Sequence, residues 1–460
     1  MRLDFLDREN ERLRLAKAFS SAEGTFCCLY GRRRCGKSRL LQESLPKRRS
    51  VYFMADEREP NIQRSALAAT IARYLPGFDA VRYPDWDSLF ARWWREAPMG
   101  TVLALDEFPY LVKSSPELPS VLQRWVDENR SRPIHLIIAG SSQRMMMGLV
   151  LDANAPLYGR AREIIPVRPL GAGWIGNALQ LNREVDLLDA YAFWGGVPRY
   201  WELANDSGGG WESIRRLVLD PLGVLHNEPN RLLLDDLKET TQAASILALI
   251  GQGCHRISEI GARLGKPATS LARPIQRLIE LGLVRREQPF GASHMAGKKT
   301  LYRLDDPFLG FWFRYVEPNR SRLESGAVAS VLKEIQQDFS LHRGQIWEAL
   351  VRQSIPLLQI EGKEWMPAHR WWGAGTDKIQ LEIDLLSEST DRQWLLIGEV
   401  KSAMSAKDQK REEAGLQCKA GKLPLTKSYR GIIHKLFVAD RTKQVSQTFI
   451  YATDVFRVLK

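Results

Sequence analysis

A string of eight residues that begins at Gly31, G-R-R-R-C-G-K-S, fits the phosphate-binding pattern G-x-x-x-x-G-K-S. Gly31 and Gly36 let backbone N–H groups curl around phosphate oxygens. Lys37 reaches the terminal phosphates, and the Ser38 hydroxyl binds magnesium. An apolar run, Phe26–Tyr30, precedes the string and a helical pattern follows it, which is the order of strand, loop and helix that this chemistry requires. The sequence therefore predicts a site for ATP and Mg²⁺.

Acidic and hydroxyl side chains follow two later apolar runs. Asp106 and Glu107 stand at the end of the run at residues 101–105. Open α/β sheets bind ligands beyond the carboxyl ends of their strands, so both side chains are expected beside the phosphate. We expect Asp106 to hold Mg²⁺, directly or through water, and Glu107 to orient and polarise the attacking water. Ser141 follows the run at residues 135–139 and is suited to sensing the terminal phosphate.

Two arginine positions extend the predicted nucleotide site. Arg34 lies inside the loop string itself. Arg160, in the stretch Y-G-R-A-R, offers a cation for charge that develops in the transition state. For Arg160 the alternative is an ordinary surface arginine that solvates the fold.

Five short apolar runs indicate the sheet that must position these groups. Polar residues scarcely interrupt them, as is typical of parallel strands covered on both faces, and helical stretches such as 118–128 separate them. The runs occupy residues 26–30, 51–54, 101–105, 135–139 and 164–167. We therefore expect an α/β fold with a P-loop ATPase core over residues 1–165.

Two further segments follow this core. Residues 166–239 carry helix-spaced apolar residues, interrupted by a Gly-Gly-Gly string at 208–210, and predict a helical lid. Residues 240–305 show three helix stripes and then a hairpin, the pattern of a winged helix-turn-helix. Its third helix would direct four polar side chains toward DNA phosphates or base edges, namely Lys266, Ser270, Arg273 and Arg277. The same fold also serves as a protein-contact or lid module, so that alternative stays open.

Several of these strings together resemble the archaeal-type ATPase family, a branch of the signal-transduction ATPases within the AAA+ and P-loop NTPases. The shared strings are F-L-D-R-E from Phe5, Y-G-R-R-R-C-G-K-S from Tyr30, D-E-F-P-Y-L from Asp106, A-G-S-S from Ala139, L-Y-G-R from Leu157 and G-G-V-P-R-Y from Gly195. The resemblance implies an ATPase core, a helical lid, a winged helix and a nuclease-like C-terminal domain. In related ATPases, arginines such as Arg160 often act across subunits, so a homo-oligomer is an open alternative.

The C-terminal segment, residues 306–460, contains a second set of candidate catalytic residues. Asp384 lies on the polar face of an alternating run, and Glu399 and Lys401 stand together at the end of a run that is otherwise apolar. This D…E-x-K order is similar to the PD-(D/E)xK nuclease superfamily, with a restriction-endonuclease-like α/β fold and with Glu348 as the acid of the preceding helix. Here Ile383 replaces the proline of the superfamily's pattern.

The resemblance implies a metal-dependent chemistry for this set. Asp384, Glu399 and Glu348 would hold Mg²⁺ or Mn²⁺, and Lys401 would orient the attacking water and offset phosphate charge. The alternative is a sheet core whose charges form a structural ion pair. Basic residues after the site would follow a nucleic-acid backbone or simply solvate a helix: Lys407, Lys410, Arg411 and Lys419.

Length and composition favour a multi-domain soluble protein. A chain of 460 residues corresponds to about three domains. No apolar stretch approaches the roughly 18 residues that cross a bilayer, and residues 1–5 lack the core of a signal peptide. Five cysteines without a C-x-x-C pair argue against a disulfide framework and a zinc site, so we expect buried thiols. We expect a cytoplasmic protein without membrane association.

The net charge of +12 is compatible with a nucleic-acid partner, DNA more than RNA, although excess charge can equally maintain solubility. Our leading hypothesis is an ATP-hydrolysing regulator coupled to a metal-dependent nuclease that acts on DNA, in which nucleotide turnover moves the lid and the winged helix. The alternative is a non-cleaving ATP-dependent switch that binds DNA or a protein partner and uses the nuclease-like domain as a scaffold. A helicase-like motor is disfavoured, because no second motor domain or aromatic-lined strand path is evident.

Overall fold

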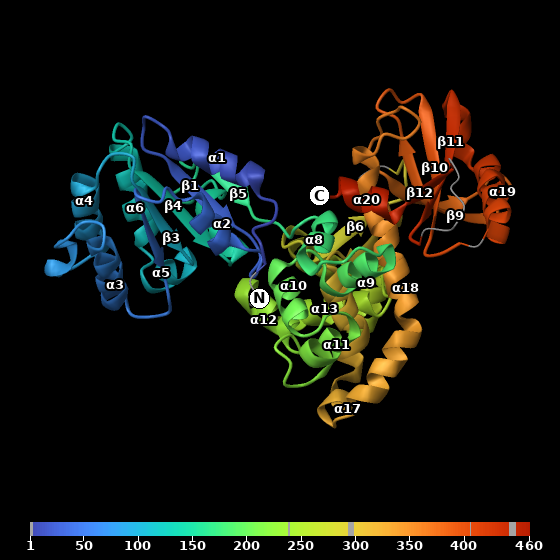
Figure 1. The fold of residues 1–460 in the computed structure, drawn as a ribbon, viewed down its shortest axis with the longest axis horizontal. Helices are drawn as coiled ribbons and strands as arrows, with labels where there is room; N and C mark the ends of the chain where they lie inside the picture. The colour runs from blue at the N-terminus through green and yellow to red at the C-terminus, as the bar shows by residue number, and fades with distance from the viewer. Residues whose placement is uncertain (1–2, 238–239, 293–298, 405, 441–447) are drawn as a thin grey trace. The chain divides into compact units, whose positions relative to one another are not determined.

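The computed structural model describes the chain except for residues 1–2, 238–239, 293–298, 405 and 441–447. The chain divides into two compact units. The N-terminal unit comprises Asp7–Pro169 with Leu234–Lys238, and the C-terminal unit comprises Met1–Leu6, Leu170–Leu233 and Glu239–Lys460. Figure 1 colours residues 7–169 of the first unit blue to teal and residues 170–460, most of which belong to the second, green to red.

The N-terminal unit is built on a five-stranded parallel sheet in the order β2-β3-β4-β1-β5. Strands β3 and β4 are buried along their whole length, as expected of parallel strands covered on both faces. The strands are β1 (Phe26–Tyr30), β2 (Ser50–Met54), β3 (Val102–Asp106), β4 (His135–Gly140) and β5 (Glu163–Pro166). The parallel α/β sheet predicted from the five apolar runs is confirmed.

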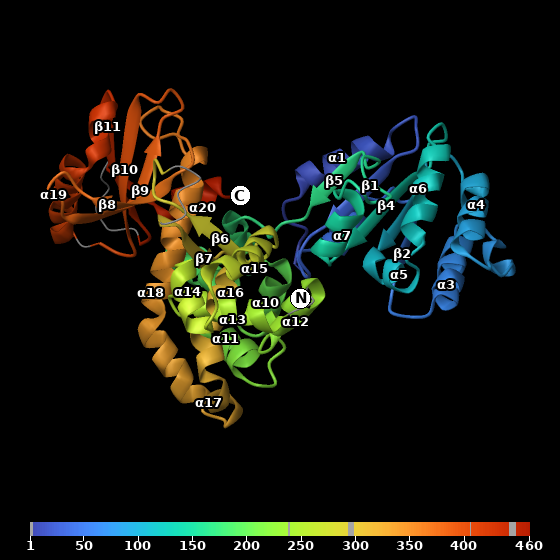
Figure 2. The same ribbon diagram turned by 180° about the vertical axis from the view of Figure 1, so that it is seen from behind.

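Helices connect these strands and cover both faces of the sheet (Figures 1 and 2). Helix α4 shows why they fold: Asp85 caps its start by accepting a hydrogen bond from the Ser88 N–H at 2.8 Å, and its buried residues recur at helical spacing. The helices are α1 (Glu9–Phe19), α2 (Lys37–Ser44), α3 (Pro60–Ala72), α4 (Trp86–Glu96), α5 (Phe108–Ser114), α6 (Leu118–Glu128) and α7 (Gln143–Val150).

The C-terminal unit begins with the helices of the predicted lid segment. These are α8 (Ile175–Leu179), α9 (Glu184–Trp194), α10 (Pro198–Asp206), α11 (Gly210–Ile214) and α12 (Glu228–Asp236), whose last residues belong to the N-terminal unit. Phe193 of α9 stacks on Phe339 with ring centroids 4.5 Å apart and meets Phe311 edge-on at 5.6 Å. Those partners come from α16 (Pro307–Phe311) and α18 (Val328–Ser354), which flank α17 (Arg320–Glu324). Helices on either side of residues 240–305 therefore share one core.

In the described part of residues 240–304, three helices precede a two-stranded antiparallel hairpin, the order expected from the sequence. The elements are α13 (Thr240–Gly251), α14 (Ile257–Leu264), α15 (Ala268–Glu280), β6 (Val284–Glu287) and β7 (Leu301–Leu304). Of the four polar residues predicted to face DNA, Arg277 is half-buried and the others are exposed. The winged-helix identification stays a prediction.

A mixed sheet in the order β12-β11-β10-β9-β8 completes the C-terminal unit. Strand β10 pairs parallel with β11 and antiparallel with β9, and α19 (Ala406–Lys422) packs on one face through Leu416 and Ala420. The strands are β8 (His369–Ala374), β9 (Gln380–Glu388), β10 (Trp394–Lys401), β11 (Gly431–Val438) and β12 (Phe449–Tyr451).

The last helix, α20 (Ala452–Val458), returns to the helical segment near residue 173. The Gly173 N–H donates to the Leu459 carbonyl at 3.1 Å, and a Cβ at Gly173 would lie 2.1 Å from the Phe456 carbonyl oxygen. Only glycine permits this approach, so residues 452–460 are seated closely on the start of the helical segment. The domain boundaries at residues 239 and 305 stay predictions, because both fall at or within the C-terminal unit.

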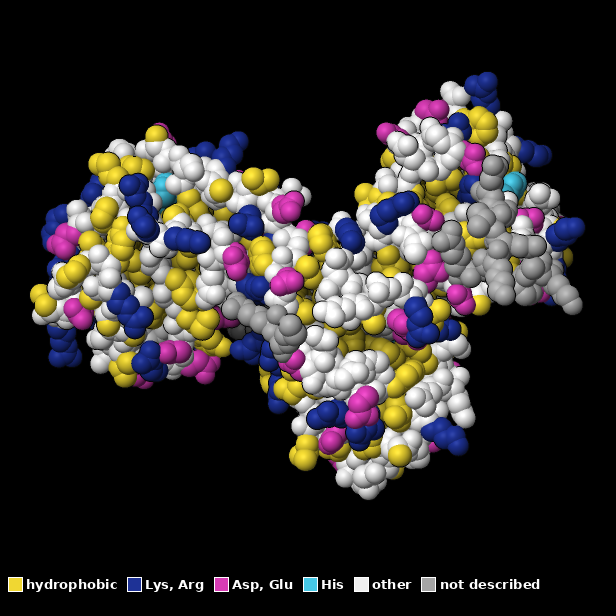
Figure 3. All heavy atoms as spheres, viewed as in Figure 1, with side chains coloured by type: hydrophobic (Ala, Val, Ile, Leu, Met, Phe, Trp, Pro, Cys, Tyr) yellow, Lys and Arg dark blue, Asp and Glu magenta, His cyan; other side chains and the backbone are white. Residues whose placement is uncertain are grey.

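The expectations about membrane spans, cysteine burial and surface charge are met in part. No helix in the described portion of the chain has the length and apolarity to span a bilayer. Cys27, Cys28 and Cys35 are buried, as expected, whereas Cys254 is half-buried and Cys418 is exposed on α19. On the face in Figure 3, lysine and arginine side chains are scattered among acidic ones, so the positive charge there does not gather in one patch.

Candidate functional sites

The phosphate loop joins β1 to α2 in the N-terminal unit. Its glycines adopt backbone conformations that other residues disfavour, with φ of +154° at Gly31 and +87° at Gly36. A Cβ at Gly31 would also lie 2.3 Å from the Val167 carbonyl oxygen. Arg34, in the middle of the loop, has φ +70°. The chain therefore curls tightly before α2, whose N-terminal N–H groups suit a phosphate.

Lys37 is buried at the start of α2, where its Nζ donates to the Arg32 carbonyl at 3.0 Å. Burial lowers the pKa of Lys37, while the neighbouring carboxylates Glu107 and Asp106 act in the opposite direction. The lysine thus bonds to its own loop, close to the two acids that the sequence placed beside it.

Asp106 ends β3 and is completely buried. Its Oδ2 accepts a hydrogen bond from the Tyr52 hydroxyl at 2.7 Å, and its Oδ1 accepts from the Glu107 N–H at 2.9 Å. Tyr52 also contacts Ser38, so its hydroxyl joins the two predicted magnesium ligands. Burial and the charge of Asp106 raise the pKa of Tyr52. Tyr52 was not among the predicted site residues, although its position in the strand beside β3 was the available signal.

Glu107 lies against Ser141 at the end of β4. The Ser141 hydroxyl donates to Glu107 Oε1 at 2.6 Å, and the Ser141 N–H donates to Oε2 at 3.2 Å. Glu107 has φ +50°, an uncommon conformation for a residue other than glycine, and such strain is frequent at functional sites. The structure thus brings together Lys37, Ser38, Asp106, Glu107 and Ser141 as predicted neighbours of one phosphate site.

Arg160 does not join this group. Its guanidinium pairs with Asp127 of α6, with Nη2 2.8 Å from Oδ2. Arg160 precedes β5, and β5 runs parallel to β1, so Arg160 lies at the edge of the sheet opposite the phosphate loop. Its role toward a terminal phosphate stays a prediction. Within this unit, Arg160 lies too far from the phosphate loop to contact a nucleotide bound there.

The predicted acidic pair of the C-terminal unit lies on adjacent strands. Asp384 of β9 accepts a hydrogen bond at Oδ2 from the Val400 N–H at 3.0 Å, which places it next to Glu399 of β10. Glu399 is buried, and burial together with the charge of Asp384 raises its pKa to about 7. Lys419 of α19 donates to Glu399 Oε1 at 2.6 Å.

Lys401 is already paired in this structure. Its Nζ lies 3.1 Å from Glu412 Oε2 and 3.7 Å from Glu399 Oε2. Burial opposes its charge, but the bond to Glu412 and the charge of Glu399 raise its pKa overall. Glu412 was not predicted, and Lys419 was expected to follow a nucleic-acid backbone or to solvate a helix, because nothing in the linear pattern showed that α19 packs against β10. Lys410 and Arg411 are exposed, and the Lys407 side chain lies outside the described residues.

Glu348 of α18 faces the same region, and burial and the charge of Asp384 raise its pKa. It also pairs with Arg352 at 3.4 Å. Across the described ranges, no group of three His, Cys, Asp or Glu side chains stands close enough to hold a metal ion. Asp384 and Glu399 therefore form a pair without Glu348, and the three-acid metal set stays a prediction.

Comparisons with known proteins agree with the nucleotide-binding half. Residues 5–203 match a family described as an ATPase domain predominantly from Archaea, and residues 312–412 match a family described as archaeal and bacterial proteins of unknown function. The chain is therefore similar to an archaeal-type ATPase domain over its first 200 residues and to that second family over part of its C-terminal segment. The nuclease-like character of the C-terminal domain is a separate question.

Whole chains of known proteins are also similar to this one. The protein MJECL04 of Methanocaldococcus jannaschii, described as uncharacterized, is 29% identical over 401 residues, which cover 86% of this chain and 87% of that one. The Walker-type ATPase PABY2304 of Pyrococcus abyssi has a TM-score of 0.52 at 19% identity, over 68% of this chain and 96% of that one. The ORC2 protein of Aeropyrum pernix has a TM-score of 0.43 at 17% identity, over 73% and 97%. The Pyrococcus protein shows a shared fold, and the family match over residues 5–203 supports the ATPase prediction.

Proposed function

We propose that this ATPase couples ATP hydrolysis to a metal-dependent nuclease activity on DNA. One observation carries the nuclease part of this proposal: the Val400 N–H of β10 donates a hydrogen bond to Asp384 at 3.0 Å. This bond sets Asp384 beside Glu399, and Lys401 follows Glu399 by two residues. Neighbouring carboxylates repel each other, and a divalent cation is the natural partner that removes this repulsion.

In the N-terminal unit, Ser38 and Asp106 would hold Mg²⁺, which would neutralise phosphate charge. The Tyr52 hydroxyl contacts both Ser38 and Asp106, which supports this role. It shows that the two oxygen ligands lie close together and that a positively polarised group is favourable between them. The loop backbone and Lys37 bind the phosphates, and Glu107 accepts a proton from the attacking water. Ser141 holds the Glu107 carboxylate in place before and during that step. Arg160 would serve a neighbouring copy of the chain.

In the C-terminal unit, Asp384 and Glu399 would hold Mg²⁺ or Mn²⁺. Two carboxylates suffice in principle, because Mg²⁺ commonly takes one or two carboxylates with water and phosphate oxygens as its other ligands. The cation would polarise the scissile phosphate and activate a water. Lys401 would orient that water after the lysine side chain has separated from Glu412. ATP turnover would act through the helical lid and the winged helix, which would present DNA to this site.

The test uses purified full-length protein with ATP, Mg²⁺ or Mn²⁺ and plasmid DNA. We expect cleavage that Lys37→Ala weakens and Asp384→Ala abolishes. Asp391→Ala is the matched control, because it removes an exposed aspartate from the β9–β10 turn. Cleavage that survives Asp384→Ala would reject the assignment.

A second candidate function is the non-cleaving switch. It is favoured by the ion pairs of Lys419 with Glu399 and of Lys401 with Glu412, which satisfy the site without metal. Calorimetric titration with Mn²⁺ separates the two. Uptake that disappears in Asp384→Ala and Glu399→Ala supports the nuclease, and the absence of such uptake supports the switch.

A further inference from the structure

An unusual group of arginines surrounds one carboxylate in the C-terminal unit. Glu287 of β6 lies 3.2 Å from Arg285 and 2.9 Å from Arg303 of β7. Arg352 of α18 and Arg370 of β8 each lie 3.8 Å from the same carboxylate. Burial alone would raise the pKa of Glu287, but the four guanidinium groups lower it to about 2. One carboxylate is therefore shared by four permanent cations.

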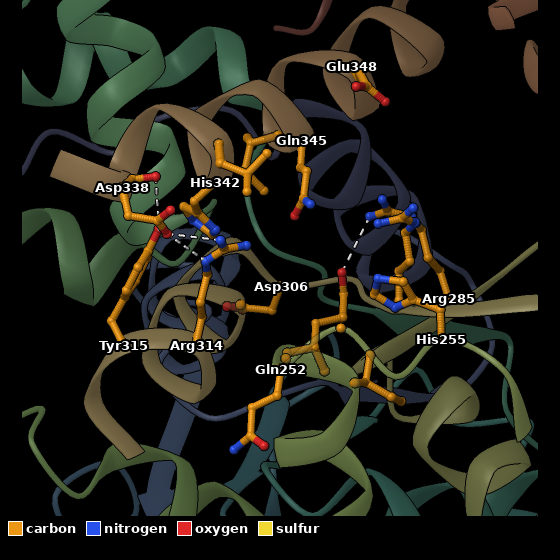
Figure 4. Close-up of a pocket in the computed structure, with 18 of the residues that line it drawn as sticks. Gln252, His255, Arg285, Asp306, Arg314, Tyr315, Asp338, His342, Gln345 and Glu348 are labelled. Carbon is orange, nitrogen blue, oxygen red and sulfur yellow. Dashed lines mark hydrogen bonds and ion pairs between the residues drawn. The ribbon is translucent and has the colours of Figure 1, made fainter. Parts of the chain in front are cut away.

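Two hollows are lined in part by this arginine group. The larger, of about 630 Å³, has mixed charge. Figure 4 shows Arg314, Tyr315 and Asp338 together at one end of it, and Arg285 with Glu348 toward the other. The smaller, of about 330 Å³, lies between β6, α18 and the start of β8. Among the described residues that line it, Glu287 is the one carboxylate, and four are arginines: Arg285, Arg286, Arg352 and Arg370.

Apart from Glu287, the acids that pair with Arg285, Arg352 and Arg370 lie outside the smaller hollow. Arg352 pairs with Glu348, which lines the larger cavity, and Arg370 pairs with Glu382, which lines neither. Arg285 contacts Asp305 at 3.5 Å, and Asp305 is likewise absent from the lining. The smaller hollow therefore presents an excess of guanidinium groups to solvent, which is a favourable environment for an anion.

We propose that the smaller hollow binds a phosphate group of a nucleic-acid strand. Arginine presents its N–H donors in a planar fork that matches phosphate oxygens, and the volume lies at the lower end of ordinary ligand sites. Arg352 and Arg370 form a buried floor, with side chains 10% and 14% exposed, so they are held in position before a ligand arrives. This proposal rests on the nucleic-acid partner of the proposed function.

The location favours a strand over a free anion. Arg286, Gln353 and His369 are exposed at the rim, so the hollow is open to a long ligand. Arg352 also donates to the main-chain carbonyl of Asp384 at 3.1 Å, which sets the hollow beside the strand that carries the candidate nuclease acid. The Phe290 N–H donates to the Arg370 carbonyl at 2.8 Å and ties the hairpin to the edge of the C-terminal sheet. A phosphate bound here would place the adjoining nucleotides near Asp384.

The test measures binding of a short fluorescein-labelled single-stranded oligonucleotide by anisotropy, with a non-hydrolysable ATP analogue saturating the phosphate loop. Arg286→Ala removes an exposed rim arginine, and Gln353→Glu places a carboxylate at the rim without disturbing the buried arginines. Each has a matched control on the exposed surface of the same unit, Arg392→Ala and Gln359→Glu. A lost contact to one single-strand phosphate lowers the salt slope by roughly 0.7 and weakens binding about fivefold near 0.1 M salt.

We expect both rim variants to show these losses and both controls to match the wild type. Equal losses in variants and controls, or no loss in either rim variant, would overturn the proposal while leaving the nucleic-acid partner intact. An absence of binding by the wild type would overturn both. Inorganic phosphate that binds the wild type but not Gln353→Glu, with oligonucleotide binding unchanged, would identify a free anion as the ligand and also overturn the strand assignment.

Discussion

The two candidate sites of this chain are built in opposite ways. The phosphate loop is one continuous stretch of backbone, and its shape follows from glycines at positions where φ is positive. The C-terminal site gathers Asp384, Glu399 and Lys419 from two strands and a helix, and side-chain ion pairs hold it together. The loop should therefore tolerate changes of pH and salt, whereas the C-terminal site and its surroundings should respond to both.

The largest expected effect concerns the loop. Lys37→Ala removes the cation that reaches the terminal phosphates and should lower the rate of ATP hydrolysis by at least roughly a hundredfold. Phosphate release measured at saturating ATP checks this, with Lys47→Ala, an exposed lysine after α2, as the control. Mn²⁺ uptake by the C-terminal unit should stay unchanged. A parallel loss of that uptake would show that the two sites are not built independently.

The next effect concerns the arginine group around Glu287. Its folded pKa is about 2 against an ordinary value of 4.5, so the ionised group contributes about 3 kcal/mol above pH 4.5. That stability should be lost as the pH falls from about 4.5 toward 2, and Glu287→Gln should lose it at neutral pH. Calorimetric unfolding at several pH values measures both. Glu382→Gln, an exposed partner of Arg370, should cost far less.

Glu399 should behave in the opposite way. Its folded pKa is raised to about 7, so its contribution is favourable below pH 4.5 and is lost as the pH rises through 7. Glu399→Gln should therefore stabilise the protein at pH 8, by about 3 kcal/mol before the lost bond to Lys419 is counted, and should change little at pH 4.5. A stability gain that is the same at both pH values would show that the buried, ionised carboxylate of Glu399 is not what destabilises the folded protein.

The smallest effect returns to the loop. Ser141→Ala removes the hydroxyl that holds Glu107 at 2.6 Å and leaves the backbone N–H bond in place. We expect ATP hydrolysis to slow by roughly tenfold with nucleotide affinity preserved, as for one lost hydrogen bond to a charged group. Ser142→Ala, at the neighbouring cap of α7, is the control. Equal losses in both variants would point to a general disturbance of the β4 end.

The contrast between the sites also explains what the sequence could predict. The loop, the acidic pair after β3 and Ser141 were predicted as neighbours, because parallel strands bring their carboxyl ends to one edge of the sheet. Tyr52 was missed, since a tyrosine in a strand is usually a packing residue. At the C-terminal site the strand positions of Asp384 and Glu399 were predicted, but the ion pairs with Lys419 and Glu412 were not. Those pairs depend on how α19 crosses β10, and no local spacing encodes that crossing.

The seat of α20 on Gly173 has a practical consequence for taking this protein apart. Residues that are far apart in the sequence pack in the same core. Gly173 hydrogen-bonds to Leu459, and Phe193 stacks on Phe339. A fragment cut at residue 305 would carry the mixed sheet but would expose the apolar faces of α16 and α18. Fragments for separate expression should therefore retain residues 170–233 together with the C-terminal sheet, and limited proteolysis should release the two as one piece.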